Sequence, residues 1–136
     1  MITAGLTVSY KRDLLQGVHQ PDDVYKMALY TEDAELSPAT THYTATEEVD
    51  ATGTYEPGGL TLRRRSVVVH GETATLGWED PVWTHTTLVA RGALIYNSSR
   101  ENRALAVMDF GEDVQSLNAP FTVAFPDRGE ALIAIE

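Results

Sequence analysis

Short runs of β-branched and aliphatic residues, separated by turn residues, recur along most of this chain. They occupy residues 24–31, 66–69, 73–78, 88–96, 104–110, 121–125 and 131–135. Seven or eight strands at regular spacing are typical of an antiparallel architecture in which two sheets enclose one core. The sequence therefore predicts an all-β fold, either an antiparallel β-sandwich or a jelly roll, with little helix.

Turn residues predict which of these strands pair. Gly71 and Glu72 form a short break between residues 60–69 and 73–79, so we expect a β-hairpin there. A polar segment, residues 97–102, predicts a second hairpin between its two flanking strands. We expect the central strands to supply the buried core, namely Leu94, Tyr96, Leu105, Val107, Phe110, Phe121, Val123 and Phe125.

The first 23 residues precede the strand pattern. Ser9 suits the N-cap of a short helix and Gly17 its end, but so short a helix is marginal unless it packs on something. Its own sandwich or a partner subunit could stabilise it, and we expect the second. We therefore divide the chain into an N-terminal arm or short helix, residues 1–23, and a β-sandwich domain, residues 24–136. The expected contacts of the arm with a neighbouring subunit are Leu6, Val8, Leu14 and Leu15.

Residues 32–59 form the least regular part of the chain, rich in Thr, Gly and Pro. The segment from Thr44 to Glu47 matches a capping box, which predicts the start of a helical turn. A long loop with a Thr-rich strand over residues 41–45 is an equal alternative, and the sequence leaves the choice open.

Composition excludes several classes of function. The formal net charge of −10 disfavours binding to nucleic acid, because an acidic surface repels phosphate. The chain has no cysteine, which excludes disulfides and thiolate chemistry and favours assembly in a reducing cytosol. We expect no signal peptide and no membrane segment, because the start lacks a basic residue followed by an apolar run and every apolar run is short.

Catalytic and metal-binding motifs are also missing. The four histidines are scattered at predicted turns and strand ends, where we expect exposed side chains, and no nucleophile elbow or paired-histidine motif occurs. Acid pairs such as Asp22 and Asp23, Glu79 and Asp80, and Glu112 and Asp113 lie beside turns and could hold a weak calcium ion, although solvated carboxylates are the simpler interpretation. We expect no enzyme activity, no cofactor and no bound metal.

Three arginines and two tryptophans are the sharpest local features. In a strand, Arg63 and Arg65 would share one face and Arg64 the other. The run either protects an edge strand from unwanted pairing or docks on an acidic neighbour, and the sequence favours neither. Trp78 is predicted to fill the core. Trp83 could cap the core, contact another subunit or offer a stacking face to a sugar.

Several longer strings resemble a family of small structural proteins in tailed-bacteriophage particles. They are KMALYT (26–31), THYTATEEV (41–49), GTYEPGG (53–59), ARGALIYN (90–97), NRALAV (102–107), DFG (109–111), FTVAFP (121–126) and ALIAI (131–135). The resemblance covers residues 24–136. The chain departs from the pattern at the three arginines and in its acidic first half.

This resemblance implies a component of the virion, assembled in the host cytoplasm. We expect a capsid cement or decoration protein that binds across neighbouring major capsid subunits and forms a homo-oligomer in the particle. The expected contacts are the four residues of the arm together with Arg63, Arg64, Arg65 and Trp83. A neck or tail attachment component is the alternative within the same class. A carbohydrate-binding module built on Trp83 is the alternative from another class.

Overall fold

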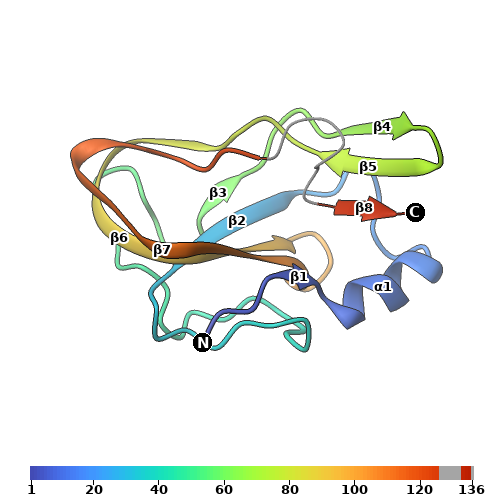
Figure 1. Ribbon diagram of the computed structural model, residues 1–136, viewed down its shortest axis with the longest axis horizontal. Coiled ribbons are helices and arrows are strands. Elements are labelled where there is room, and N and C mark those ends of the chain that lie inside the picture. The colour runs from blue at the N-terminus through green and yellow to red at the C-terminus, as the bar shows by residue number, and fades with distance from the viewer. Residues whose placement is uncertain (126–132, 136) are drawn as a thin grey trace.

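Two antiparallel sheets and one short helix make up the part of the chain that the computed structural model describes, residues 1–125 and 133–135 (Figure 1). The larger sheet has the strand order β1-β7-β6-β2-β3 and the smaller sheet the order β4-β5-β8. The prediction of an all-β, antiparallel, sandwich-type fold with a short N-terminal helix is confirmed. The elements are β1 (Gly5–Leu6), α1 (Val8–Leu15), β2 (Tyr25–Tyr30), β3 (Leu60–Thr61), β4 (Ser66–His70), β5 (Thr73–Gly77), β6 (Val82–Asn97), β7 (Arg103–Thr122) and β8 (Ile133–Ile135).

The main core lies between the two sheets. Met27 and Leu29 of β2 and Ile95 of β6 are buried in the same cluster as Leu76 of β5 and Trp78. Aromatic rings connect the layers, since Trp78 lies 5.5 Å from Tyr25 between ring centroids. Residues two apart in a strand share a face, which is why alternating apolar positions of β2 enter this core together.

The opposite face of the larger sheet is covered by the irregular segment, residues 31–59, so β2 is buried on both faces. Leu36 of this segment packs with Tyr30, Leu94 and Val107 in a second cluster. The long loop expected as one alternative is confirmed, but neither the helical turn nor the Thr-rich strand is present: residues 46–47 form a turn, and residues 41–45 form only an isolated bridge at His42. A helix cannot continue there because Glu47 has a φ of +60°.

Strands β6 and β7 form one long, bent hairpin that runs through both layers (Figure 1). Register shifts occur at several points, one of them between Ala90 and Gly92, and such bulges bend a strand pair. Residues 104–110 and 121–122 therefore belong to the same strand, where the sequence predicted two. The intervening residues escaped prediction because only Ser116 among residues 111–118 is buried.

Residues 60–69 do not form the continuous strand that the sequence predicted. Residues 60–61 pair with β2 in the larger sheet, and residues 66–70 pair with β5 in the smaller one. Arg64, between them, has a φ of +57°, a left-handed conformation that a strand does not allow. The chain changes sheets at the arginine run. The predicted hairpin around Gly71 and Glu72 is confirmed, with His70 opposite Thr73.

Six of the eight predicted core residues are buried. Phe110 and Phe125 are only half-buried and pack against the edge of the main core. The last predicted strand is present over residues 133–135, while residues 131–132 lie outside the described part of the chain.

The N-terminal segment is built into the domain. Gly5 and Leu6 pair with Val107 and Ala106 of β7, and Tyr10 of α1 is buried in the main core. Of the two ways of stabilising residues 1–23, the structure shows packing on the chain's own sheet. The expected boundary at residue 23 is therefore wrong, because strand pairing and core packing both cross it.

Helix α1 begins two residues earlier than the sequence suggested. Thr7, not Ser9, is the N-cap: its Oγ1 accepts a hydrogen bond of 3.1 Å from the N–H of Tyr10. The same hydroxyl lies 3.1 Å from the Ala104 carbonyl oxygen, to which it donates. Thr7 thus caps the helix and fastens it to β7. The helix ends at Leu15, and Gly17 follows with a φ of +69°.

Candidate interaction surfaces

The predicted contacts of the N-terminal segment divide into one packed residue and three exposed ones. Leu6 is half-buried and packs against the main core. Val8 and Leu15 are 63% and 91% exposed, and Leu14 is also exposed. Val8 and Leu15 are two helical turns apart and so lie on the same side of α1. This pair defines the helix surface, a place where aliphatic side chains meet solvent.

The three arginines do not form one patch. Arg63 and Arg64 are exposed, and Arg64 Nε lies 3.4 Å from Glu79 Oε2. Arg65 is half-buried, and its charge acts on the hydroxyls of Tyr10 and Tyr25. Burial raises the pKa of Tyr10 to about 12, and the nearby Arg65 opposes that rise. Arg63 and Arg64 are therefore the exposed arginines of the run, and Arg64 also pairs with Glu79 of its own chain.

Trp83 is 1% exposed, so it neither contacts another subunit nor offers a stacking face. Its ring packs between Tyr55 and Phe121, at centroid distances of 5.7 and 6.3 Å. The interface role and the sugar platform proposed for Trp83 are both wrong, because the irregular segment closes over it. Trp78 is buried in the core as predicted.

Two further groups of exposed aliphatic side chains were not predicted. The first is on β4, where Val67, Val68 and Val69 are 58%, 44% and 69% exposed. The second is on the distal half of the β6–β7 hairpin, where Val89 and Leu117 are exposed. The three successive valines could have predicted the exposed group on β4. Successive residues of a strand point to opposite faces and only one face meets the core, so the three valines cannot all be buried.

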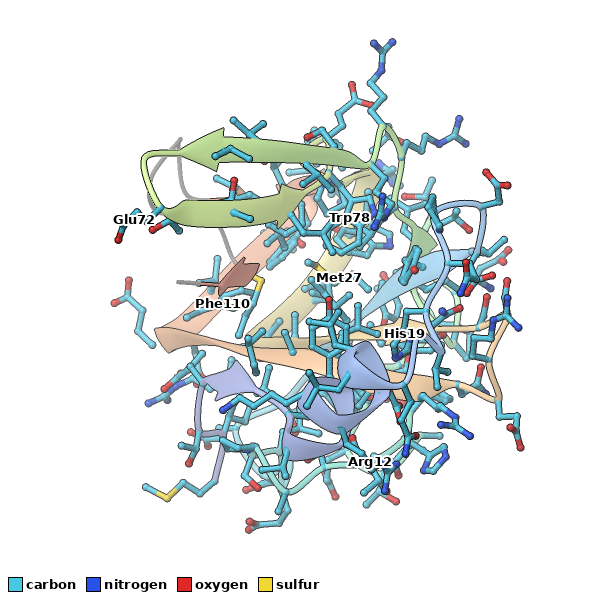
Figure 2. All side chains as sticks on the ribbon, turned by 90° about the vertical axis from the view of Figure 1, so that its right-hand side faces the viewer. Arg12, His19, Met27, Glu72, Trp78 and Phe110 are labelled. Carbon is cyan, nitrogen blue, oxygen red and sulfur yellow. The ribbon has the colours of Figure 1, made fainter. Side chains whose placement is uncertain are left out.

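Titratable side chains gather at one end of the larger sheet, where α1 meets the turn between β6 and β7. Asp13 is fully buried and accepts a hydrogen bond of 3.1 Å from Arg103 Nη1. The His19 side chain is 4% exposed, with its Nε2 at 3.5 Å from Asp13 Oδ2. Figure 2 shows His19 between the helix and the sheet. The expectation of an exposed histidine is wrong at this position, whereas His42 and His85 are exposed.

The hydrogen bonds of this cluster assign its protons. Asn97 Nδ2 lies 2.9 Å from His19 Nδ1, which therefore accepts, and the ring proton is on Nε2 facing Asp13. Burial lowers the pKa of His19, and the adjacent Asp13 opposes this. Asp23 accepts a hydrogen bond of 2.8 Å from Arg100 Nε, and this bond lowers the pKa of Asp23 to about 2.

A histidine held by an aspartate is also the arrangement of a general base, but here both ring nitrogens face protein groups. The side chain is enclosed and has no route to a substrate proton. The cluster instead joins α1 to the hairpin turn.

A second, partly buried network surrounds Glu48 in the irregular segment. Its Oε2 accepts hydrogen bonds from the Tyr55 hydroxyl at 2.6 Å and the Gly58 N–H at 2.8 Å, and its Oε1 accepts one from Tyr43. Burial raises the pKa of Tyr43 and Tyr55, and the hydrogen bond to Glu48 adds to the rise. A half-buried carboxylate thus holds the loop that covers the larger sheet.

Within residues 1–125 and 133–135, no group of three or more His, Asp or Glu side chains is placed to hold a metal ion. Each acid pair has at least one member bound to another protein group: Asp23 bonds Arg100, Glu79 pairs with Arg64, Asp80 Oδ1 accepts from the N–H of Phe125, and Asp113 pairs with Arg91. None of the helices described in the structure is long and apolar enough to cross a membrane.

A surface cavity of about 390 Å³ contains Arg91 and several acids. Arg91 lies 3.8 Å from Glu32, 3.9 Å from Asp109 and 3.5 Å from Asp113. Acids on three sides already neutralise this cation, so it offers no free charge to an anionic ligand.

No protein-family model, curated protein or solved structure matches this chain.

Proposed function

We propose that this chain is a structural subunit of a tailed-bacteriophage particle, and specifically a capsid cement or decoration protein that binds across neighbouring major capsid subunits. It acts by surface contact and needs no catalytic residue and no cofactor. The observation that carries this proposal is the presence of exposed aliphatic side chains at three separate places on a domain whose core is otherwise complete. The choice of a tailed-bacteriophage particle rests on the resemblance of residues 24–136 to small structural proteins of such particles.

The three places are the helix surface (Val8 and Leu15), β4 (67–69) and the distal hairpin (Val89 and Leu117). Single exposed aliphatics are ordinary, but groups of them on a helix and on two strand pairs favour binding to other proteins. A subunit in a shell contacts several neighbours at once and therefore needs several separate contact surfaces. The net charge of −10 keeps such a protein soluble before assembly.

The buried position of Trp83 leaves the carbohydrate-binding alternative without its proposed site. A position in the neck or tail stays open as an outcome of experiment. Hundreds of copies in a particle indicate the capsid, and a dozen or fewer indicate the neck or tail.

The test is quantitative mass spectrometry of purified particles of the phage that encodes the chain, followed by imaging of a labelled subunit. We expect the chain in every particle at a copy number comparable to that of the major capsid protein. Its absence from purified particles would overturn the proposal. A low copy number at one vertex would overturn the cement role and favour the neck or tail.

A matched pair of variants tests whether the helix surface takes part. Leu15→Glu and Gln16→Glu each add one negative charge to an exposed position at the end of α1. If the aliphatic side chain is buried on assembly, only Leu15→Glu reduces incorporation, by about tenfold or more, since burying leucine contributes roughly 1.5–3 kcal/mol. Equal incorporation of both variants excludes this surface.

A further inference from the structure

Within the described residues, the outer edge of β4 is an open strand edge. In the smaller sheet, β5 lies between β4 and β8, and no described strand pairs with the other side of β4 (Figure 1). The edge strands of the larger sheet, β1 and β3, are only two residues long, whereas β4 has five. Proteins protect long edges with lysine, proline or bulges, and Ser66–His70 contains none of these.

The side chains of β4 are apolar on both faces. Val67 and Val69 point to one face and Val68 to the other, and all three are exposed. β-branched side chains favour strand pairing. An edge with this composition favours the addition of another strand.

The hairpin geometry indicates which backbone groups are free. In a two-residue hairpin the flanking pair, here His70 and Thr73, exchanges both hydrogen bonds, and such pairs alternate along the strand. Residues 66, 68 and 70 therefore bond to β5. The N–H and C=O groups of Val67 and Val69 point outward.

Charge selects the direction of an added strand. Arg63 and Arg64 precede β4 and are exposed, and Glu72 follows it and is also exposed. A parallel second copy would bring like charges together. An antiparallel copy centred on Val68 places the arginine end of each strand beside Glu72 of the other, with position 64 opposite position 72. The same register pairs Val67 with Val69 of the second copy, so the outward groups of both strands bond.

We propose that β4 pairs antiparallel with β4 of a second copy of this chain, about a two-fold axis at Val68. The product is a continuous six-stranded sheet with the order β8-β5-β4-β4-β5-β8. Because each copy uses the same edge, the assembly closes at two copies. The pairing follows from the edge itself and does not depend on a virion role.

Cysteine cross-linking tests the register, because the natural chain has no cysteine. At the two-fold axis, Val68 faces its own copy across a pair without hydrogen bonds, where the Cα atoms are about 4.5 Å apart, within disulfide range. The two copies of Val67 are displaced along the strands to roughly 8–9 Å, beyond that range. On mild oxidation of the isolated chain, we expect Val68→Cys to link at least about tenfold faster than Val67→Cys, because pairing concentrates the thiols. Equal rates for the two variants overturn this register.

Sedimentation equilibrium of the full chain tests the charge arrangement. We expect a mass of twice 14.9 kDa, with dissociation on dilution. Glu72→Arg should weaken the dimer roughly threefold to tenfold. The exchange Arg64→Glu with Glu72→Arg should restore part of the loss, because Arg64→Glu also breaks the ion pair of Arg64 with Glu79. Glu56→Arg, an exposed position in the irregular segment, makes the same change in net charge and should have no effect.

Three results overturn the inference. The first is a monomer at all concentrations with no preferential link at Val68. The second is an assembly larger than two, which would show an open contact in place of a two-fold one. The third is a chain that stays monomeric alone but binds another protein through β4, which would make a foreign strand the occupant.

Discussion

Asp13 and Arg103 hold α1 on the start of β7: the fully buried Asp13 carboxylate lies 3.1 Å from Arg103 Nη1. Ninety positions of sequence separate the two residues, so the pair joins the N-terminal segment to the central hairpin. His19 completes the enclosure of Asp13 on the other oxygen. Several predictions about stability depend on this arrangement.

Replacing Asp13 by Asn should destabilise the domain by about 1.5–3 kcal/mol, the usual contribution of hydrogen bonds to a charged group. The loss is below that for a fully buried ion pair because Arg103 can reach solvent. Urea unfolding measures it as a lower midpoint with an unchanged slope. Arg12→Gln is the control, since this exposed partner of Asp13 should contribute less than about 1 kcal/mol.

Protonation of His19 should make the free energy of unfolding depend on pH. Burial lowers its pKa in the folded protein below the ordinary 6.5, so the unfolded chain binds the proton more readily. The stability due to neutral His19 is therefore complete above about pH 6.5 and declines as the pH falls below it. Thermal melts from pH 8 to 5 should show this decline. His19→Gln should remove it, and the exposed His42→Gln should leave it in place.

Asp23 should produce a separate loss at lower pH. The hydrogen bond from Arg100 lowers the pKa of Asp23 from 3.8 to about 2. Its contribution to stability is thus present above about pH 3.8 and is lost as the pH falls toward 2. Asp23→Asn should abolish this lower step. Because the charge of Asp23 raises the pKa of His19, the same variant should also move the His19 step to lower pH. One merged transition in the wild-type chain would contradict the assignment.

Glu48 should control the order of the irregular segment without controlling the sheets. Glu48→Gln replaces one acceptor oxygen by a donor beside Tyr43, Tyr55 and Gly58, which leaves at least one donor unpaired at a cost of about 1–3 kcal/mol. Hydrogen exchange should quicken in residues 40–58 and stay slow in β6. Glu47→Gln, at the exposed neighbouring position, should leave exchange unchanged throughout.

Alternation of apolar residues was enough to predict the strands that face the core. Residues 25–30 and 73–77 form strands where the pattern predicted them. One face of each strand packs on the core, and a buried face requires apolar residues at every second position. Residues 111–118 show no such alternation, since they are mostly polar and their two aliphatic residues, Val114 and Leu117, are exposed. They extend β7 through backbone pairing with β6, which sequence patterns do not show.

The features that define the candidate surfaces depend on backbone conformations that cannot be predicted from the residue types. Arg64 at a φ of +57° moves the chain from one sheet to the other, and nothing in a run of arginines indicates this. The burial of Trp83 depends on a loop whose position is set by Glu48, far along the chain. The three valines of β4 were readable in the sequence, but their exposure required knowledge that β4 is an edge.

Removing residues 2–16 should unfold the isolated domain, in contrast to the behaviour of a detachable arm. The deletion strips β1 from β7, removes buried Tyr10 and deletes Asp13, which leaves Arg103 and His19 without their shared partner. Loss of a large buried aromatic alone costs about 3–5 kcal/mol, and whole domains are stable by only about 5–15 kcal/mol. We expect circular dichroism of the truncated chain to show loss of the cooperative thermal transition. The double variant Val8→Ser with Leu15→Ser, which changes only exposed positions of the same segment, should keep that transition. A truncated chain that melts cooperatively at the wild-type temperature would show that the segment is dispensable for folding and that its packing on β7 contributes little.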